Sequence, residues 1–259
     1  MELGIAGRTA LICGASRGMG RAIARQLARE GVIVTMLARR VGPLGEAAAA
    51  ISAETGTTPR IVAADITTEA GRRAALAACP TPDILVTNAD GPPPGDFRAY
   101  SRADWIAALD ALMLAPIALM QASVDAMAAR GFGRVVNIVS RSVKIAQAEL
   151  ALSNGARSGL VGFTAGLARE MVRFNVTINN LLPGPFDTDA QRRHVEGLAE
   201  RTGRPYQTLW EERRAANPAG RFGMPEEIGA YCAFLCSAQA GFITGQNLLV
   251  DGGAYPGTY

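Results

Sequence analysis

The sequence predicts a doubly wound α/β fold, in which one seven-stranded parallel sheet carries helices on both faces. Three observations support this prediction. The chain of 259 residues is 49% hydrophobic and 19% charged, which is enough to bury one large core. Short apolar runs rich in β-branched residues alternate with longer alanine-rich stretches, as in repeated βαβ units. The first apolar run also ends in a glycine-rich loop that opens a helix.

The expected strands are almost continuously apolar, which is typical of strands buried on both faces. In chain order they are "TALICG", "VIVTMLA", "RIVAAD", "DILVTNA", "RVVNIVS", "VTINNLL" and "NLLVDGG". Helical patterns lie between them at about 18–30, 43–55, 68–79, 101–130, 150–173 and 225–238. Segment 187–217 is polar, rich in arginine and broken by glycine and proline, which indicates an insertion at one edge of a single domain spanning 1–259.

Composition favours a small-molecule enzyme over other classes. The net charge of +3 comes from basic residues scattered among acids, without the basic stripe of a nucleic-acid surface. No leader-like segment opens the chain, and no apolar run approaches the roughly 18 residues of a membrane span, so we expect a cytoplasmic protein. The four cysteines form no metal-ligand framework and are interpreted as buried reduced thiols: Cys13, Cys79, Cys232 and Cys236.

The glycine-rich loop predicts a dinucleotide site. Gly14, Gly18 and Gly20 follow the spacing G-x-x-x-G-x-G between the first strand and the first helix. Glycine permits the tight turn and the close approach of backbone N–H groups to a pyrophosphate, and the helix N-terminus adds a favourable dipole.

With this loop the chain resembles the short-chain dehydrogenase/reductase family over nearly its whole length, and within it the bacterial β-ketoacyl-acyl carrier protein reductases. The matching pieces occur in the family's order. They are the loop Gly14 to Gly20, "AADIT" around Asp65, "TNADG" at Asn88, "VVNIVS" ending at Ser140, "LLPGPFDTD" with Pro183, "GRFGMPEEI" and "FITGQNLLVDGG".

Basic residues at the end of the second strand favour NADP(H) over NAD(H). NAD users place a carboxylate there, against the ribose 2′-hydroxyl, whereas NADP users place arginine against the 2′-phosphate. This chain has Arg39 and Arg40 at that point and Arg17 inside the glycine loop. Guanidinium groups suit a dianionic phosphate. The alternative is that Arg39 or Arg40 merely points to solvent.

The resemblance implies further cofactor contacts. Asp65 and Ile66 would hold the adenine, and Asn88, Ala89 and Asp90 would run along the riboses. Asp90 stands where the family usually has glycine, and its carboxylate would either bond a ribose hydroxyl or face the pocket. The remaining expected cofactor residues are Ser16, Met19, Pro183, Gly184, Phe186 and Thr188.

The catalytic positions of the family are altered here. The family uses a serine, a tyrosine, a lysine one helical turn later, and an asparagine in the preceding helix. Matching the motifs gives Ser140, Ser153, Arg157 and about Leu112, so only the serine is retained. An aliphatic hydroxyl is a much weaker acid than a phenol, and a guanidinium stays protonated. We expect Arg157 to keep a ribose-binding role and to lose the proton-relay role.

Lys144 is the candidate replacement acid. It is the sole lysine among 26 basic residues, and it follows Ser140 by four positions in the loop that borders the family's active site. Burial beside Arg141 and Arg157 would make its ammonium a better proton donor. The alternative is an exposed loop lysine.

Other residues gain roles only through the resemblance. It places a substrate lid at the insertion 187–217, where His194 is interpreted as a surface residue. Tyr206 and Trp210 would line the pocket or simply pack the lid helices. The loop "GPPPGDF", Gly91 to Phe97, together with Phe186, predicts a mainly apolar pocket mouth.

Two functions remain open at this point. The first is an NADP(H)-dependent oxidoreductase acting on a carbonyl or an imine, with proton delivery rearranged around Ser140, Lys144, Ser153 and Arg157. The second is a nucleotide-binding family member with lyase, isomerase or dehydratase activity, or a catalytically silent subunit. The resemblance also implies a homotetramer or homodimer in which helices 101–130 and 150–173 pair. Small residues along the second helix would allow close approach or pack within the chain: Gly155, Ala156, Gly159 and Gly162.

Overall fold

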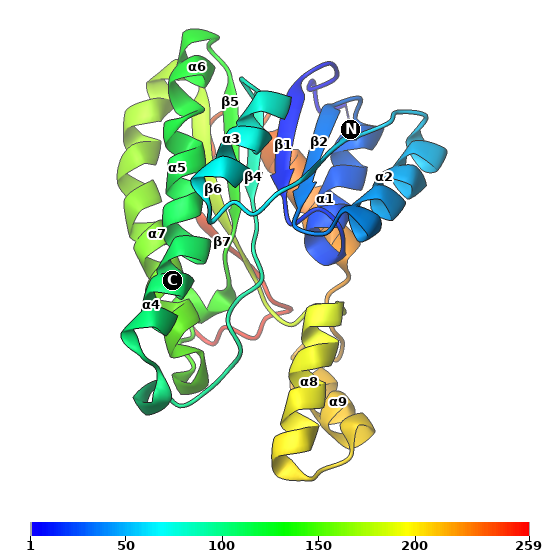
Figure 1. Ribbon diagram of the computed structural model, residues 1–259, viewed down its shortest axis with the longest axis vertical. Coiled ribbons are helices and arrows are strands. Elements are labelled where there is room, and N and C mark those ends of the chain that lie inside the picture. Colours follow the sequence, from blue (N-terminus) through cyan, green and yellow to red (C-terminus); the bar gives the residue numbers. More distant parts are fainter. Residues whose placement is uncertain (1, 259) are drawn as a thin grey trace.

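Seven parallel strands form one sheet in the order β3-β2-β1-β4-β5-β6-β7, as the computed structural model, which describes residues 2–258, shows in Figure 1. The strands are β1 (Thr9–Cys13), β2 (Ile33–Ala38), β3 (Arg60–Ala63), β4 (Ile84–Thr87), β5 (Gly133–Ile138), β6 (Val176–Pro183) and β7 (Asn247–Val250). The helices are α1 (Gly18–Arg29), α2 (Val41–Thr55), α3 (Glu69–Ala78), α4 (Arg102–Leu109), α5 (Ala115–Gln121), α6 (Val124–Ala129), α7 (Ala151–Met171), α8 (Asp189–Thr202), α9 (Tyr206–Ala215) and α10 (Pro225–Cys236). The predicted fold class and all seven strands are confirmed.

Two hydrophobic cores cover the sheet, one on each face. Helices α1, α2 and α10 pack on one face, and α3, α5, α6 and α7 pack on the other. Consecutive strand residues point to opposite faces, so Leu11 enters one core and Ile12 the other, and both are fully buried. This two-sided burial explains why the strands read as uninterrupted apolar runs.

The strand order reverses between β1 and β4, because β1 leads outward to β2 and β3 while β4 leads the other way to β5, β6 and β7. In an open parallel sheet the loops on either side of such a point diverge and leave a crevice at the carboxyl ends of the strands. The topology therefore locates the candidate site beyond the ends of β1, β2 and β4.

The helix expected at 101–130 is interrupted twice. Residues Asp110–Leu114 form a π-helical turn between α4 and α5, just before Pro116, whose ring cannot fit a regular helix interior. A second break follows α5, where the Ser123 hydroxyl donates a hydrogen bond to the Leu119 carbonyl oxygen four residues back. The prediction of one continuous helix was therefore wrong at these two points.

The same segment bears on the membrane question. Arg102–Ala129 contains an 18-residue window of mean hydropathy 1.6, so one stretch of the described chain meets the length and composition test for a membrane span. The expectation that no apolar run approaches that length was wrong. Leu119 and Met120 are fully buried against the sheet, so the segment supplies a core helix of this fold.

The insertion between β6 and α10 forms two helices, α8 and α9, which project away from the sheet in Figure 1. Aromatic side chains pack α9 against the segment that precedes α10. The rings of Tyr206 and Trp210, both on α9, stack with centroids 5.8 Å apart, and Trp210 meets Phe222 edge to face at 4.4 Å. This arrangement accounts for both aromatics as packing residues of α9.

A buried polar ladder crosses the sheet beneath the site. The Thr87 hydroxyl donates to the Asn137 amide oxygen at 2.6 Å, and the Asn137 amide donates to Asn180 at 2.9 Å. Asn180 in turn donates to Thr164 on α7 and to Asn247 on β7. These side chains satisfy one another, as buried polar groups must, and they join four strands to a helix.

All four cysteines are buried free thiols, as predicted. Burial raises the pKa of the Cys13 thiol to about 12, although a backbone hydrogen bond from Asn88 opposes the rise. No group of three or more His, Cys, Asp or Glu side chains suited to a metal ion occurs within residues 2–258.

Candidate active site

The glycine-rich loop joins β1 to α1 and bends tightly over the crevice. Gly14 and Gly18 adopt left-handed conformations, with φ of 63° and 53°, and Gly20 packs directly against the Gly14 carbonyl group. Helix α1 begins with no acidic residue in its first turn and no side-chain cap from Arg17. Its first backbone N–H groups therefore remain available to an anionic ligand.

A cavity of about 470 Å³ lies beside this loop, at the point where the strand order reverses. Most of the residues predicted to bind a cofactor line it. They are Gly14, Ser16, Arg17, Gly18, Met19, Arg39, Arg40, Asp65, Ile66, Asn88, Ala89, Asp90 and Thr188. Five other predicted residues are not in its wall: Gly20, Arg157, Pro183, Gly184 and Phe186.

Sequence reasoning missed seven residues of the cavity wall: Leu37, Ala38, Ala64, Thr67, Ala111, Asp189 and Ala190. The first three end β2 or follow β3, so their position at the carboxyl edge of a parallel sheet could have identified them. Ala111 and Ala190 carry no such signal, because only the folding of the π-helical turn and α8 toward the crevice brings them there.

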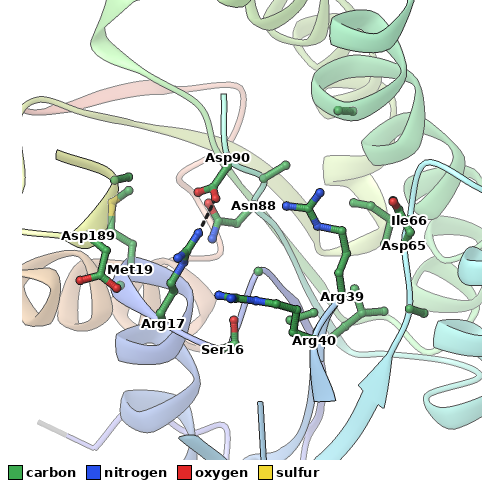
Figure 2. A pocket seen from close by; sticks show the side chains of 18 of the residues that line it. Ser16, Arg17, Met19, Arg39, Arg40, Asp65, Ile66, Asn88, Asp90 and Asp189 are labelled. Atoms are coloured by element: carbon green, nitrogen blue, oxygen red, sulfur yellow. Dashed lines mark hydrogen bonds and ion pairs between the residues drawn. The ribbon is translucent and has the colours of Figure 1, made fainter. Parts of the chain in front are cut away.

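Three arginines face the cavity from two different loops. Figure 2 shows Arg17 of the glycine loop and Arg39 and Arg40 beyond β2 around one space. Neither Arg39 nor Arg40 forms an ion pair within residues 2–258, whereas Arg17 is paired with Asp90. Beyond β2 the cavity therefore presents two guanidinium groups without an ion pair in the described part of the chain, while Asp65, Asp90 and Asp189 also line the wall.

Asp90 links three elements across the mouth of the cavity. Its carboxylate accepts a hydrogen bond from Arg17 at 2.8 Å, drawn as a dashed line in Figure 2, and lies 3.8 Å from Arg193 on α8. All three side chains are substantially exposed. Asp90 thus lies in the cavity wall, and its predicted bond to a ribose hydroxyl stays a prediction.

Asp65 is held by the backbone that follows it. Its carboxylate accepts hydrogen bonds from the backbone N–H of Thr67 at 3.0 Å and from the Thr67 hydroxyl at 2.8 Å. The backbone hydrogen bond is the main cause that lowers the pKa of Asp65, with the Arg39 guanidinium contributing. Asp65 thus shapes the loop that follows β3 in the cavity wall.

Ser140 lies two residues beyond the end of β5 and begins the short 3-10 turn Arg141–Val143. Its Oγ accepts a hydrogen bond from the Ser142 backbone N–H at 3.1 Å, and its side chain is half-buried. A hydroxyl has one proton to donate and two lone pairs to accept with. Because a backbone donor takes one lone pair, the Ser140 proton can be given to another acceptor.

Arg157 is buried on α7, with 8% of its surface exposed. Its Nε donates to Ser153 Oγ at 3.1 Å, its Nη1 to the carbonyl oxygens of Ile138, at 3.0 Å, and Val139, and its Nη2 to that of Ala89, at 3.2 Å. The guanidinium therefore ties α7 to the ends of β4 and β5.

These contacts bear on the predicted roles of both residues. Burial lowers the pKa of the Arg157 guanidinium to about 10, and the charge of Asp90 opposes this effect. Most of its donors are engaged by backbone carbonyls, so its ribose contact remains a prediction. The Ser153 hydroxyl accepts from Arg157 and keeps its own proton to donate.

Lys144 differs from the expectation of burial. Its side chain is exposed, because the 3-10 turn that follows Ser140 directs residue 144 outward. The premise that burial beside Arg141 and Arg157 would tune its ammonium was therefore wrong. Its Nζ lies instead 5.3 Å from the ring centroid of Tyr255, a residue of the segment that follows β7.

His194 lies half-buried on α8, which faces the loop after β5. Burial is the main cause that lowers its pKa, with contributions from Arg213 and Arg201 and an opposing contribution from Glu149 of the loop 141–150. The interpretation of His194 as a surface residue was therefore incomplete, because its side chain is partly shielded from solvent and lies near the charges of Arg213 and Arg201.

The proline-rich loop after β4 is fastened to the same region. The Gly95 N–H donates to the Glu149 carbonyl oxygen at 2.9 Å, and the Tyr100 hydroxyl donates to that of Pro93 at 3.4 Å. Phe97 is 54% exposed, consistent with an apolar surface beside the site. Phe186, in contrast, is buried against Gly223, where it fixes the base of α8.

The small residues of α7 divide into two groups. A Cβ at Gly155 would lie 3.0 Å from the Trp105 ring, and one at Gly159 would lie 2.7 Å from the Met113 sulfur, so these glycines accommodate the chain's own side chains. At Gly162 no atom lies within 4 Å of such a Cβ. Only the latter part of the helix has space for another surface.

Comparison with known proteins agrees with this geometry. A family model described as enoyl-(acyl carrier protein) reductase matches residues 14–255. The 3-oxoacyl-(acyl-carrier-protein) reductase FabG of Vibrio harveyi is 31% identical, with 98% of this chain and 99% of that protein aligned. Gluconate 5-dehydrogenase of Gluconobacter oxydans is 32% identical, over 96% of this chain and 95% of that protein.

The similarity extends to three dimensions. The crystal structure of L-sorbose reductase from Gluconobacter frateurii, complexed with NADPH and L-sorbose, superposes with a TM-score of 0.93 and 29% identity. The match covers 99% of this chain and all of that one. With its strand order, its glycine loop and these full-length similarities, the chain belongs to the short-chain dehydrogenase/reductase family.

Proposed function

We propose that the protein is an NADP(H)-dependent oxidoreductase that acts on a carbonyl or an imine of a small molecule, with an atypical proton donor. The observation that carries this proposal is the cavity of about 470 Å³, where an uncapped helix N-terminus and the cationic side chains of Arg17, Arg39 and Arg40 meet. The family relationship supports it, since similar proteins bear the names of reductases and dehydrogenases.

The cavity suits a dinucleotide that carries an additional phosphate. Backbone N–H groups of the glycine loop and of the first turn of α1 would hold the pyrophosphate. Arg39 and Arg40 form no ion pair within residues 2–258 and would hold the 2′-phosphate, which accounts for two guanidinium groups in one wall. An NAD-specific site would instead place a carboxylate at the end of β2.

In this proposal NADPH supplies a hydride when bound, and the chain positions the substrate and moves the proton. Ser140 and Ser153 each have one lone pair taken by a donor of the chain, so each can point its own proton at a substrate oxygen or nitrogen. Arg157 sets the orientation of Ser153 and places a buried positive charge behind it. Neither serine replaces a phenol as an acid.

The proposal includes imine substrates because a protonated iminium accepts hydride with less help from an acid than a ketone does. A positioned general acid contributes about 10²–10⁴-fold to the rate. The absence of the family's tyrosine from position 153 therefore weakens a carbonyl reductase more than an imine reductase.

The proposal includes a lid formed by the insertion 187–217 and an assembly of two or four copies through α4 to α7.

A binding titration and a substrate panel test this proposal. The fluorescence of NADPH is followed on addition of the purified protein, and then NADPH consumption is followed with ketones, aldehydes, diketones, ketoses and cyclic imines. We expect NADPH binding and turnover of at least one class. Binding without turnover of any of them favours a non-redox family member or a catalytically silent subunit instead.

Cofactor preference has its own test. Replacing Arg40 by glutamate places a carboxylate where NAD users have one, so we expect NADPH affinity to fall by about 10-fold or more while NADH affinity changes little. Arg60, an exposed arginine at the start of β3, provides the matched control as Arg60→Glu. Equal affinities for NADPH and NADH in the unaltered protein would contradict the assignment.

A further inference from the structure

The segment after β7 is fixed beside the candidate active site. The Gly184 N–H donates to the Val250 carbonyl oxygen at 2.9 Å, and a Cβ at Gly184 would lie only 2.8 Å from Asp251 Cα. Residues 251–258 therefore leave the sheet against the Pro183–Gly184 segment. Figure 1 shows them at the end of the sheet from which α8 and α9 project.

Asp251 anchors Tyr255 in this segment. Asp251 is buried, with 8% of its surface exposed, and its carboxylate accepts hydrogen bonds from the backbone N–H groups of Gly253 at 3.1 Å and Tyr255 at 2.9 Å. Its carbonyl oxygen accepts from the buried Asn217 amide at 2.8 Å. Tyr255 is thus positioned by a buried hydrogen-bonded turn, with its side chain half-buried.

The Tyr255 ring meets the sole lysine of the chain. Lys144 Nζ lies 5.3 Å from the ring centroid, within the range of a cation–π contact. Lys144 belongs to the turn that Ser140 begins, since the Val143 N–H donates to the Ser140 carbonyl oxygen and the Lys144 N–H to that of Arg141. A phenol and an amine therefore lie together at the turn that Ser140 begins.

We propose that Tyr255 is the proton donor of the reaction and that Lys144 is its positioning residue, a proposal that rests on the function proposed above. The chain has serine and arginine where its family has tyrosine and lysine. Tyr255 and Lys144 bring the same two functional groups to the same edge of the sheet from other segments.

The chemistry follows from the two groups. As the carbonyl carbon gains the hydride, the π electron pair passes to the oxygen, and that oxygen takes the proton of the Tyr255 hydroxyl. The phenolate left behind is stabilised by the Lys144 ammonium and regains a proton from water. The net reaction consumes one hydride and one proton. The exposed Lys144 remains in contact with the solvent that resupplies the proton.

Conservative variants test the two roles. Tyr255→Phe keeps the ring and its contact with Lys144 but removes the proton, so we expect kcat to fall about 10²–10⁴-fold. The NADPH dissociation constant should stay within about twofold, because the hydroxyl acts in the chemical step rather than in binding. Tyr231→Phe on α10 is the matched control and should retain full activity.

The pairing predicts non-additive effects. Lys144→Met should lower kcat, and Lys144→Arg should restore part of the loss because it keeps the positive charge over the ring. On the Tyr255→Phe background, Lys144→Met should cause no further loss, since a residue that acts through the phenol has nothing left to assist. Fully additive losses would overturn the positioning role of Lys144.

A chemical probe examines the location of Tyr255 without turnover. Nitration by tetranitromethane, mapped by mass spectrometry, should be slowed at Tyr255 by NADP⁺ and unchanged at Tyr231. Unchanged nitration at Tyr255 with bound NADP⁺, or a Tyr255→Phe variant as active as the unaltered protein, overturns this inference and leaves the proposed function intact. Failure to bind NADPH at all counts against the proposed function itself.

Discussion

Arg157 allows the sharpest test of how α7 is held against the sheet. Its guanidinium joins α7 to the ends of β4 and β5 through Ser153 Oγ and three backbone carbonyl oxygens. Substitution by alanine removes all four hydrogen bonds together and leaves their acceptors without this partner. We therefore expect Arg157→Ala to destabilise the protein.

The magnitude follows from two opposing contributions. Hydrogen bonds to a charged group are worth about 1.5 kcal/mol each at the low end, or about 6 kcal/mol for four. Burial opposes them, because lowering the pKa from 12.5 to about 10 corresponds to a cost of about 3 kcal/mol at about 1.4 kcal/mol per unit. The net loss of unfolding free energy in Arg157→Ala is therefore about 3 kcal/mol.

Urea unfolding at fixed protein concentration, followed by circular dichroism, measures this loss. Arg169→Ala is the matched control, because Arg169 is an exposed residue of the same helix, and its unfolding free energy should change by less than about 0.5 kcal/mol. NADPH affinity is measured in parallel. An Arg157→Ala protein of unaltered stability but strongly reduced NADPH affinity would refute the reasoning, since the guanidinium would then act on the cofactor rather than on the strand ends.

Three further predictions concern the surroundings of the site. Asp90→Asn removes a carboxylate that competes for Arg17, so NADPH should bind about 2- to 5-fold more tightly in low salt; weaker binding would show that Asp90 holds a ribose hydroxyl. Asn137→Ala leaves two buried partners unsatisfied and should lower the urea-derived unfolding free energy by about 3 kcal/mol, whereas a loss below about 1 kcal/mol would show that the ladder is dispensable. A hydrogen bond from Arg221 lowers the pKa of Glu227 from 4.5 to about 2, so its contribution is present above pH 4.5 and lost as the pH falls toward 2. Because Glu227 is 43% exposed, that contribution is about 1 kcal/mol, and acid titration of Glu227→Gln should show a correspondingly smaller loss of stability than the unaltered protein.

The sequence pattern correctly predicted those parts of the site that a single continuous segment forms. The strand–loop–helix around Gly14 depends on a turn that only glycine permits, and its position after the first apolar run placed the cavity correctly. Arg39 and Arg40 were found for the same reason, because they follow a strand whose carboxyl end must border the crevice. In each case the physical constraint lies within a few consecutive residues.

The sequence pattern could not predict where the side chains of α7 point. Spacing shows that Ser153 and Arg157 share a helical face, but only the packing of α7 against β4 and β5 turns the guanidinium toward their carbonyl oxygens. Likewise, the exposure of Lys144 depends on the turn after Ser140 and on which distant segments of the chain pack against it.

The sequence by itself determined the parallel sheet, its helical cover and the nucleotide cavity, because burial on both strand faces and the glycine turn impose their patterns on neighbouring residues. Tertiary structure alone decided the anchoring of Arg157 and the meeting of Lys144 with Tyr255. Lys144 and Tyr255 are far apart in the chain, and no local periodicity records a contact that arises only when β5 and β7, with β6 between them, end at the same edge of one sheet.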